Sequence, residues 1–369
     1  MKSRLLDALN AKINSVDDAV LVSCFVAERA AYLARRGDSE RAANEIAEVR
    51  KRNLRWGDPR LSVWVNIAEG VLELTAGNDE AAIDRFDRSV AVSRAVGMER
   101  EFSVAEVWLA YIDFSRNEIG NLVDRLNRVL RDQSLADTSA LARARMLVGQ
   151  SFHYCGKYES ARPWYSAARA LVVENGDDVL HSALMFNIAS HHVSNYREKE
   201  LRGRLTSASA RELVLIGESV RNYDEIAGIT SLDLYAGTLA ASLEMFSGRF
   251  AEARVIFEKY VTPARMQGLE RMMSSYLADL AYCSARLGDN EAASRYAAIA
   301  CDSIGSLVHL DDLAATRSRL ALVFDHLKEN NRKVEQMLLA DELWGRHEVV
   351  QLGNLERLSR LDHQLPKSI

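Results

Sequence analysis

The sequence predicts an all-α fold, a solenoid of about eight stacked helix hairpins. Apolar residues recur at steps of three and four positions, as in Val65, Ala68, Val71 and Leu72, which is the spacing of one helix face. Only four prolines interrupt the 369 residues. Glycines that follow such helical patterns recur about 40 residues apart, which indicates a repeated unit. We therefore expect helix nearly throughout and one continuous array.

Glycine sets the register of the repeat, because a residue in the left-handed conformation commonly ends a helix. The five turn glycines are Gly37, Gly77, Gly156, Gly248 and Gly288. Each is followed after five residues by an alanine and preceded by seven residues by a small residue: Ala30, Gly70, Gly149, Ala241 and Ala281. Small residues let two helices approach to about 8–10 Å. Four of the five turns have a bulky apolar residue nine positions later: Ile46, Phe86, Tyr165 and Phe257.

Interpolation places three further turns in the array. Asn117 is expected to end a helix, because Asn is the second choice after Gly for a left-handed cap. Tyr196 is expected to mark the next turn, with Ala189 seven residues before it. The last hairpin is expected to turn near 328–331.

The order small–glycine–small–bulky resembles the tetratricopeptide repeat, most closely in residues 156–161, Gly-Lys-Tyr-Glu-Ser-Ala, and 248–253, Gly-Arg-Phe-Ala-Glu-Ala. The resemblance covers about 16–345 and implies a right-handed superhelix that binds a protein or peptide segment in its concave groove. A period of about 40 residues exceeds the usual length of about 34 and is similar to that of bacterial sensory arrays. No nucleotide-binding or DNA-binding motif accompanies the repeats.

The resemblance also implies which residues line the groove. The first helix of each hairpin would face it, at positions about 13, 10, 6, 3 and 2 residues before the turn. The candidate binding residues in this register are Trp64, Tyr111, Phe114, Arg143, Met146, Gln150, His153, Tyr154, Tyr235, Tyr282 and Arg286. Arg35, Ile67, Val71, Val107 and Met245 share the register. Aromatic and Arg side chains are common in binding hot spots. Alternatively, these aromatic residues form the core within each repeat.

Two segments depart from the repeat. An excess of about 12 residues before Gly248 is expected near 195–210, either as a contact loop or as a tolerated surface insertion. The second segment, 346–369, follows an array of residues 1–345 and is expected to form an amphipathic helix. Its residues 354–363 resemble the linker helix before GGDEF-type diguanylate cyclases, which implies a dimerisation role. The alternative is a capping helix of the solenoid.

Composition limits the other classes of function. A net charge of −5 argues against nucleic acid as the main partner. No membrane span or secretion signal is evident, and four scattered cysteines are typical of a reduced, cytoplasmic protein. Acidic pairs such as Asp177-Asp178 fall at expected helix starts, where they suit the helix dipole. We found no catalytic, metal-binding or cofactor motif, since His181 and His192 lie too far apart on one helix to share an ion.

The leading hypothesis is a cytoplasmic, non-catalytic adaptor or sensor that binds a protein or peptide in the groove. The alternative is a homodimeric signalling regulator that pairs through its C-terminal helix and has no output domain. An enzyme with an unrecognised site and a nucleic-acid-binding solenoid are two further alternatives.

Overall fold

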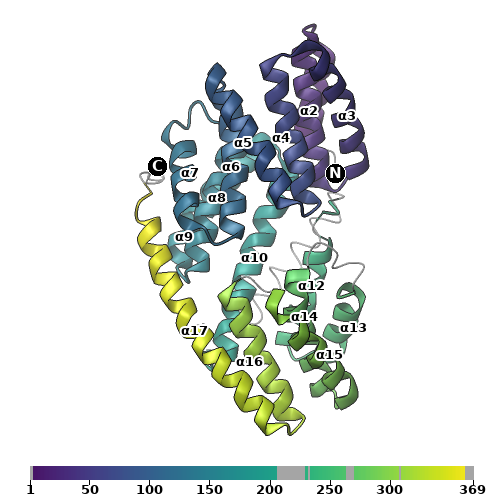
Figure 1. Cartoon of the computed structure of the whole chain (residues 1–369), viewed down its shortest axis with the longest axis vertical. Coiled ribbons are helices and arrows are strands. Elements are labelled where there is room, and N and C mark those ends of the chain that lie inside the picture. Colours follow the sequence, from purple (N-terminus) through teal and green to yellow (C-terminus); the bar gives the residue numbers. More distant parts are fainter. Residues whose placement is uncertain (1–2, 206–228, 232, 263–269, 307–308, 362–369) are drawn as a thin grey trace. The chain divides into compact units, whose positions relative to one another are not determined.

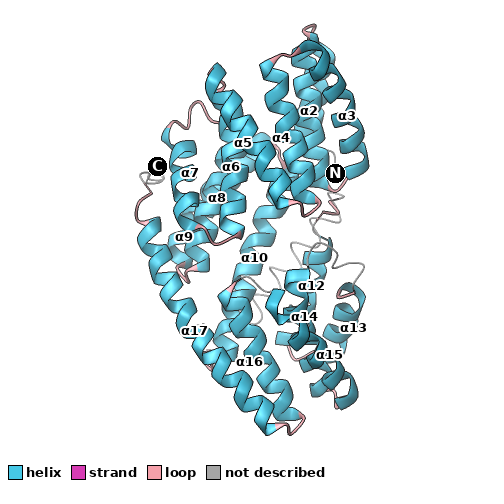
Figure 2. Ribbon diagram, viewed as in Figure 1, coloured by secondary structure: helices cyan, strands magenta, loops and turns pink. Residues whose placement is uncertain are grey.

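The computed structural model describes residues 3–205, 229–231, 233–262, 270–306 and 309–361, and these residues contain helices and no strand (Figure 2). The all-α prediction is therefore confirmed. The helices in chain order are α1 Arg4–Ser15, α2 Ala19–Arg36, α3 Ser39–Trp56, α4 Pro59–Thr75, α5 Asp79–Val96, α6 Glu99–Ser115, α7 Ile119–Arg131, α8 Thr138–Tyr154, α9 Tyr158–Asn175, α10 Asp178–Leu201, α12 Asp233–Phe246, α13 Phe250–Tyr260, α14 Glu270–Arg286, α15 Asn290–Ser303, the 3₁₀ turn η1 Ile304–Ser306, α16 Leu310–His326 and α17 Asn330–Leu358.

The chain divides into two compact units (Figure 1). Unit 1 comprises Met1–Met185, Asp224–Ser231 and Asn354–Ile369, and unit 2 comprises Phe186–Tyr223 and Leu232–Gly353. In unit 1 the packed hairpins are α2 with α3, α4 with α5, α6 with α7, and α8 with α9. In unit 2, α12 packs on α13 and α14 packs on both α15 and α16. Each unit is thus built from helix hairpins, as the repeat predicts.

The turns inside the hairpins lie where the repeat register places them. All five turn glycines have positive φ, from 70° at Gly156 to 100° at Gly37. Asn117 and Lys328 are the two non-glycine residues with positive φ among the described residues, so both interpolated turns are confirmed. A second set of glycines with positive φ, outside the repeat register, ends the helices between hairpins: Gly57, Gly97 and Gly176.

The small residues of the repeat lie at close helix contacts. A Cβ atom added to Gly70 would lie 2.7 Å from the ring of Phe86, and one added to Gly149 would lie 2.7 Å from the ring of Tyr165. The alanines of the pattern are fully buried: Ala30, Ala42, Ala82, Ala161, Ala241, Ala253, Ala281 and Ala293. The close approach predicted for the small residues is therefore confirmed at Gly70 and Gly149. The bulky residues Phe86 and Tyr165 pack on these glycines within one hairpin, and not, as expected, only in the gap between adjacent hairpins.

Two expectations about helix ends are corrected. Tyr196 does not mark a turn, because α10 continues through it to Leu201 and the left-handed residue is Gly203. Residues 195–201 of the expected insertion therefore belong to a helix, and 206–210 lie outside the described residues. The C-terminal helix begins at Asn330, not near 346, since α17 is continuous across that position.

Candidate ligand-binding cavity

Unit 1 contains a cavity of about 630 Å³, within the range of about 300–1,000 Å³ that is usual for ligand sites. The first helices of its four hairpins, α2, α4, α6 and α8, supply most of the lining. Residues of α1, the segment 134–137 before α8 and Asn175 at the end of α9 complete it. The lining therefore follows the rule that the first helix of each hairpin faces the concave side.

Aromatic rings form much of the apolar lining. Trp64 of α4, Trp108 of α6 and Phe25 of α2 contribute to it, together with Ile67 and Val71. The ring of Trp108 also stacks on the ring of Phe86, with centroids 6.1 Å apart, and this contact fixes its position. A wall of rigid rings buries a large apolar area at little cost in conformational entropy.

Arg143 of α8 is the distinctive charged residue of the cavity. It is 7% exposed, and its guanidinium carbon lies 3.8 Å from the centre of the Trp108 ring. Among the described residues its guanidinium makes no hydrogen bond and no ion pair. Burial, and then the nearby positive charge of Arg35, lower the pKa of Arg143 below its ordinary value. A buried guanidinium without a partner is unfavourable in a structural core.

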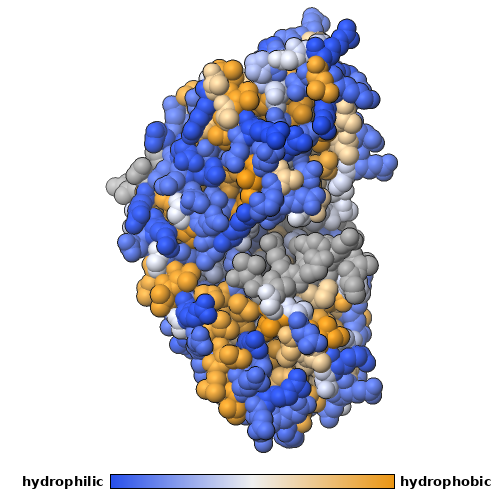
Figure 3. All heavy atoms as spheres, in the orientation of Figure 1, coloured by the Kyte–Doolittle hydropathy of each residue, from blue (hydrophilic) through white to orange (hydrophobic). Residues whose placement is uncertain are grey.

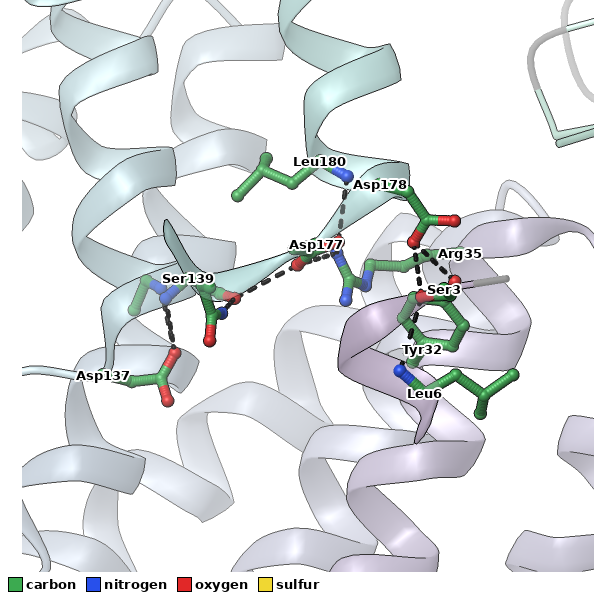
Figure 4. Close-up of polar contacts among 11 residues, drawn as sticks. Ser3, Leu6, Tyr32, Arg35, Asp137, Ser139, Asp177, Asp178 and Leu180 are labelled. Carbon is green, nitrogen blue, oxygen red and sulfur yellow. Dashed lines mark hydrogen bonds and ion pairs between the residues drawn. The ribbon is translucent and has the colours of Figure 1, made fainter. Parts of the chain in front are cut away.

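The carboxylate nearest to this charge is already engaged (Figure 4). Asp177 accepts hydrogen bonds from Arg35 Nη1 at 3.0 Å, from the Ser139 hydroxyl at 3.1 Å and from the Leu180 backbone N–H at 3.0 Å. Burial alone would raise the pKa of Asp177, but Arg35, the Leu180 N–H and Arg143 outweigh it and hold the pKa below its ordinary value. Asp177 is therefore ionised and has a full set of partners.

Neighbouring contacts tie the first helices together at this place. The hydroxyls of Ser3 and Tyr32 donate to Asp178 Oδ1 at 2.8 and 2.7 Å (Figure 4). Asp177 accepts from the N–H three residues on, so it begins α10 as an N-cap. Asp137 begins α8 in the same way and accepts from Ser139 N and Ala140 N. The expectation that acidic residues mark helix starts is confirmed.

A second charged group of the lining is balanced differently. Arg100 of α6 contacts Glu28 at 2.8 Å and Asp137 at 2.9 Å, so one guanidinium serves two carboxylates. Desolvation raises the pKa of Glu28, although Arg100 opposes it. Glu28 Oε2 is buried and accepts no hydrogen bond from the described residues. The cavity thus has an excess of positive charge at Arg143 and of negative charge at Glu28 and Asp137.

The structure brings some of the predicted groove residues together and separates others. Trp64 and Arg143 line the cavity, as do Arg35, Ile67, Val71 and Val107 of the same register. Tyr111, Phe114 and Tyr154 are partly buried against the core of α6, α7 and α8. Met146, Gln150 and His153 are buried, and His153 faces Tyr158 and Tyr165 of α9.

The remaining candidates belong to unit 2 and lie outside this cavity. Tyr235 packs against Phe186, with ring centroids 5.8 Å apart. Arg286 donates to the Tyr282 hydroxyl at 2.9 Å and lies over the Phe250 ring. Tyr282 and Arg286 thus contact each other along α14. They remain predictions as binding residues.

Sequence reasoning missed several lining residues. Glu28, Arg100 and Trp108 lie one or more positions outside the groove register, and Lys12 comes from α1, which precedes the repeats. No motif marked them. The sequence did offer one signal, at Asp137. The N-cap residue of a groove helix such as α8 places a carboxylate at the edge of the groove.

The C-terminal helix uses one face within unit 1. Leu358 is 2% exposed in the core formed by α6, α7 and α8, and Leu355 and Leu361 pack against that core. Asn354 Nδ2 donates to Asn117 Oδ1 at 3.1 Å. These contacts pack the end of α17 against the core of unit 1. Elsewhere on α17, Leu338, Val349 and Leu352 are exposed.

Two further expectations concern the whole chain. Within the described residues, no helix is both long and apolar enough to span a membrane. All four cysteines have free thiols, and three of them are buried.

Comparison with known proteins places the fold. No protein-family profile matches the chain, and no curated protein matches it. A crystal structure of a Rap protein in complex with competence and sporulation factor matches with a TM-score of 0.60 at 10% identity, over 95% of this chain and 99% of that one. Aspartyl phosphate phosphatase F from Bacillus subtilis matches with a TM-score of 0.50 at 15% identity, over 99% of this chain and 91% of that one. The chain therefore has the helical-repeat fold that these proteins share.

Proposed function

We propose that this chain is a non-catalytic binding protein that takes a protein or peptide segment into the cavity of unit 1. The observation that carries the proposal is Arg143, a buried guanidinium beside Trp108 that no described residue pairs with. Hot spots of binding energy are rich in Trp, Tyr and Arg that lie in pockets shielded from water. A ligand that supplies the missing contacts would gain most of its affinity at this residue.

The structural neighbours support the same class of function. The Rap protein was solved with competence and sporulation factor bound, so this fold accommodates a partner. The second neighbour is named as a phosphatase, but a fold shared at 15% identity carries no activity to this chain. The proposal for this chain therefore depends on its own cavity.

A selection from a pool of short random peptides tests the proposal. The parent protein and Arg143→Ala are incubated with the pool, and retained peptides are identified by mass spectrometry. The parent should retain a defined subset, and Arg143→Ala should bind that subset with a loss of about 2 kcal/mol or more, the threshold of a hot spot. That loss corresponds to roughly 30-fold in affinity.

Arg162→Ala is the matched control, because Arg162 is an exposed Arg on α9 outside the cavity. It should retain the same subset as the parent. Failure of the parent to retain any peptide, or equal retention by Arg143→Ala, would contradict the proposal. Tyr111→Ala distinguishes a residue of the core from a residue of the cavity wall. Tyr111 contacts the edge of Trp108 but does not line the cavity.

A second candidate function is that of a homodimeric regulator that pairs through α17. Leu338, Val349 and Leu352 are 67%, 69% and 68% exposed on that helix. Figure 3 shows apolar residues in orange among hydrophilic ones along the lower part of α17. Truncation would also remove Leu358 from the core of unit 1, so substitution is the cleaner test.

Sedimentation of the parent and of the double variant Val349→Gln/Leu352→Gln decides the point. A dimeric parent and a monomeric variant would support pairing through α17. A parent that is monomeric at tens of micromolar would exclude it.

A further inference from the structure

We infer that the cavity of unit 1 recognises a free carboxylate, the C-terminal carboxylate of a peptide, at Arg143. The inference rests on the proposed function and adds the chemistry of the ligand. It assigns the carboxylate to the guanidinium of Arg143 and the last apolar side chain to the wall formed by Trp64 and Trp108.

The local balance of charge calls for an anion. Arg35 and Arg143 are two guanidiniums, and both interact electrostatically with the carboxylate of Asp177. Asp177 Oδ1 accepts from Arg35 and from the Leu180 N–H, and Oδ2 accepts from Arg35 and from Ser139. Since Arg35 already pairs with Asp177, one positive charge remains uncompensated in a desolvated place. A buried lone charge is costly, and an anionic ligand removes that cost.

The geometry of Arg143 favours a carboxylate. Its guanidinium carbon lies 3.8 Å from the centroid of Trp108, so the ring supports the cation through a cation–π contact. None of its N–H donors is used by a described residue, and the planar guanidinium fork matches the two oxygens of a carboxylate. The single uncompensated charge suits a monoanion better than a dianion.

Arg100 is excluded as the carboxylate site by its partners. It contacts Glu28 at 2.8 Å and Asp137 at 2.9 Å, and a third carboxylate there would be repelled. The part of the cavity beside Arg100 instead offers a hydrogen-bond acceptor, since Glu28 Oε2 is buried and accepts no hydrogen bond from the described residues. A peptide carries N–H donors as well as a terminal carboxylate, whereas a simple organic acid carries only the carboxylate.

The size of the cavity limits the segment. A volume of about 630 Å³ is that of a small-molecule site, so it encloses the last few residues of a chain and not a long segment. The end of a peptide is therefore the part that the cavity is built to receive.

The test compares two pools of random tetrapeptides, one with a free C-terminal carboxylate and one with the C-terminal amide. Full-length parent, Arg143→Gln and the control Arg162→Gln are each incubated with both pools, and bound peptides are measured by mass spectrometry. The parent and Arg162→Gln should retain the free acids about tenfold or more over the amides, the effect of losing one charged hydrogen-bond pair. Arg143→Gln should retain both pools equally.

Each other outcome overturns a distinct claim. If the parent retains acids and amides equally, the carboxylate site is wrong while peptide binding stands. If the parent retains neither pool, the proposed function of the cavity fails together with this inference. If Arg143→Gln keeps the preference for acids, the carboxylate binds elsewhere.

The source of the carboxylate is tested with 3-phenylpropionate, an aromatic acid without N–H donors. It should compete with the acid pool weakly or not at all, and competition at the affinity of the retained peptides would overturn the peptide assignment. Circular dichroism melts of Arg143→Gln and of Arg143→Met show whether either variant is unfolded. Two variants keep the test decisive if one of them folds poorly.

Discussion

Two buried arginines, one in each unit, have opposite surroundings. Arg319 of α16 in unit 2 is fully buried and donates to Asp279 at 3.0 Å and to both oxygens of Glu200, at 3.2 and 2.6 Å. Arg143 of α8 in unit 1 is buried beside a cavity and donates to no described residue. Both lie over an aromatic ring, Tyr282 and Trp108 respectively. The difference between them is therefore in their partners.

The pKa directions follow from that difference. Burial alone would lower the pKa of Arg319, but Glu200 and Asp279 raise it above its ordinary value. For Arg143, burial and the charge of Arg35 prevail over the pull of Asp177, and the pKa is lowered. A buried charge with all its partners is part of the structure. A buried charge without partners at the edge of a cavity destabilises the free protein and favours a ligand.

The largest expected effect is at Arg319. Arg319→Met leaves the carboxylates of Asp279 and Glu200 without their main cation, and we expect the free energy of unfolding to fall by about 3–5 kcal/mol. Chemical denaturation measures it. Adding Asp279→Asn should recover part of the loss, because one lone carboxylate is then removed. A loss below about 1 kcal/mol would show that the network does not hold unit 2 together.

A smaller effect separates the two faces of α8. Gly149→Ala places a Cβ 2.7 Å from the Tyr165 ring, and we expect a loss of about 1–3 kcal/mol. Gly345→Ala in α17 is the control: nothing lies within 4 Å of its Cβ, so it should stabilise by roughly 0.5–1 kcal/mol. Equal stability of the two variants would mean that α8 is not tightly packed on α9, and that Arg143 is not rigidly positioned.

Unit 2 also contains a carboxyl group, that of Asp312, whose surroundings disfavour the ionised form. Burial, and then the neighbouring charge of Asp311, raise the pKa of Asp312 to about 6, although His309, Arg197 and His347 oppose the shift. Because the native pKa exceeds that of the unfolded chain, the native state loses stability as the pH rises from about 4 to about 6.

Asp312→Asn should therefore be more stable than the parent above pH 6, and the advantage should disappear below about pH 4. Thermal melts of both proteins across that range measure the difference. A difference that does not change with pH would show that the pKa of Asp312 is the same in the native and unfolded states, and thus that the native structure does not oppose its ionisation.

The smallest expected effect is at Arg143. Arg143→Met removes an unpaired cation and leaves an unbranched apolar side chain in its place, so the free energy of unfolding should change by less than about 1 kcal/mol or rise. Denaturation under the conditions used for Arg319→Met gives the direct comparison. A loss as large as that of Arg319→Met would make Arg143 a structural residue and remove the basis of the binding proposal.

Sequence reasoning succeeded at Asn117, where it used the chemistry of a single position, and the turn that it placed near 328–331 from the spacing falls at Lys328. Both residues adopt positive φ. It failed at Tyr196, where only the spacing was used. The residues that follow Tyr196 are good helix formers, and the next residue able to end a helix in the left-handed conformation is Gly203.

The groove register predicted the cavity in part. Within α8, Arg143 lines the cavity and the later positions Gln150 and His153 do not, whereas in α2 and α4 the later positions Arg35 and Val71 also line it. Further lining comes from α1 and the segment 134–137. Neither belongs to a repeat, so no repeat register contains them.

The sequence by itself determined the all-α class, the turns inside the hairpins at the repeat glycines and at Asn117, and the close contacts of small residues. These depend on local properties, namely the backbone freedom of Gly and Asn and the contact of a small residue such as Gly149 with Tyr165 16 positions later. Only the tertiary structure decided which buried arginine is paired. Glu200 reaches Arg319 across 119 residues of sequence, while Asp177 is held by Arg35 and not by Arg143. Partners so distant in the chain are set by how the hairpins stack, and no single repeat encodes that stacking.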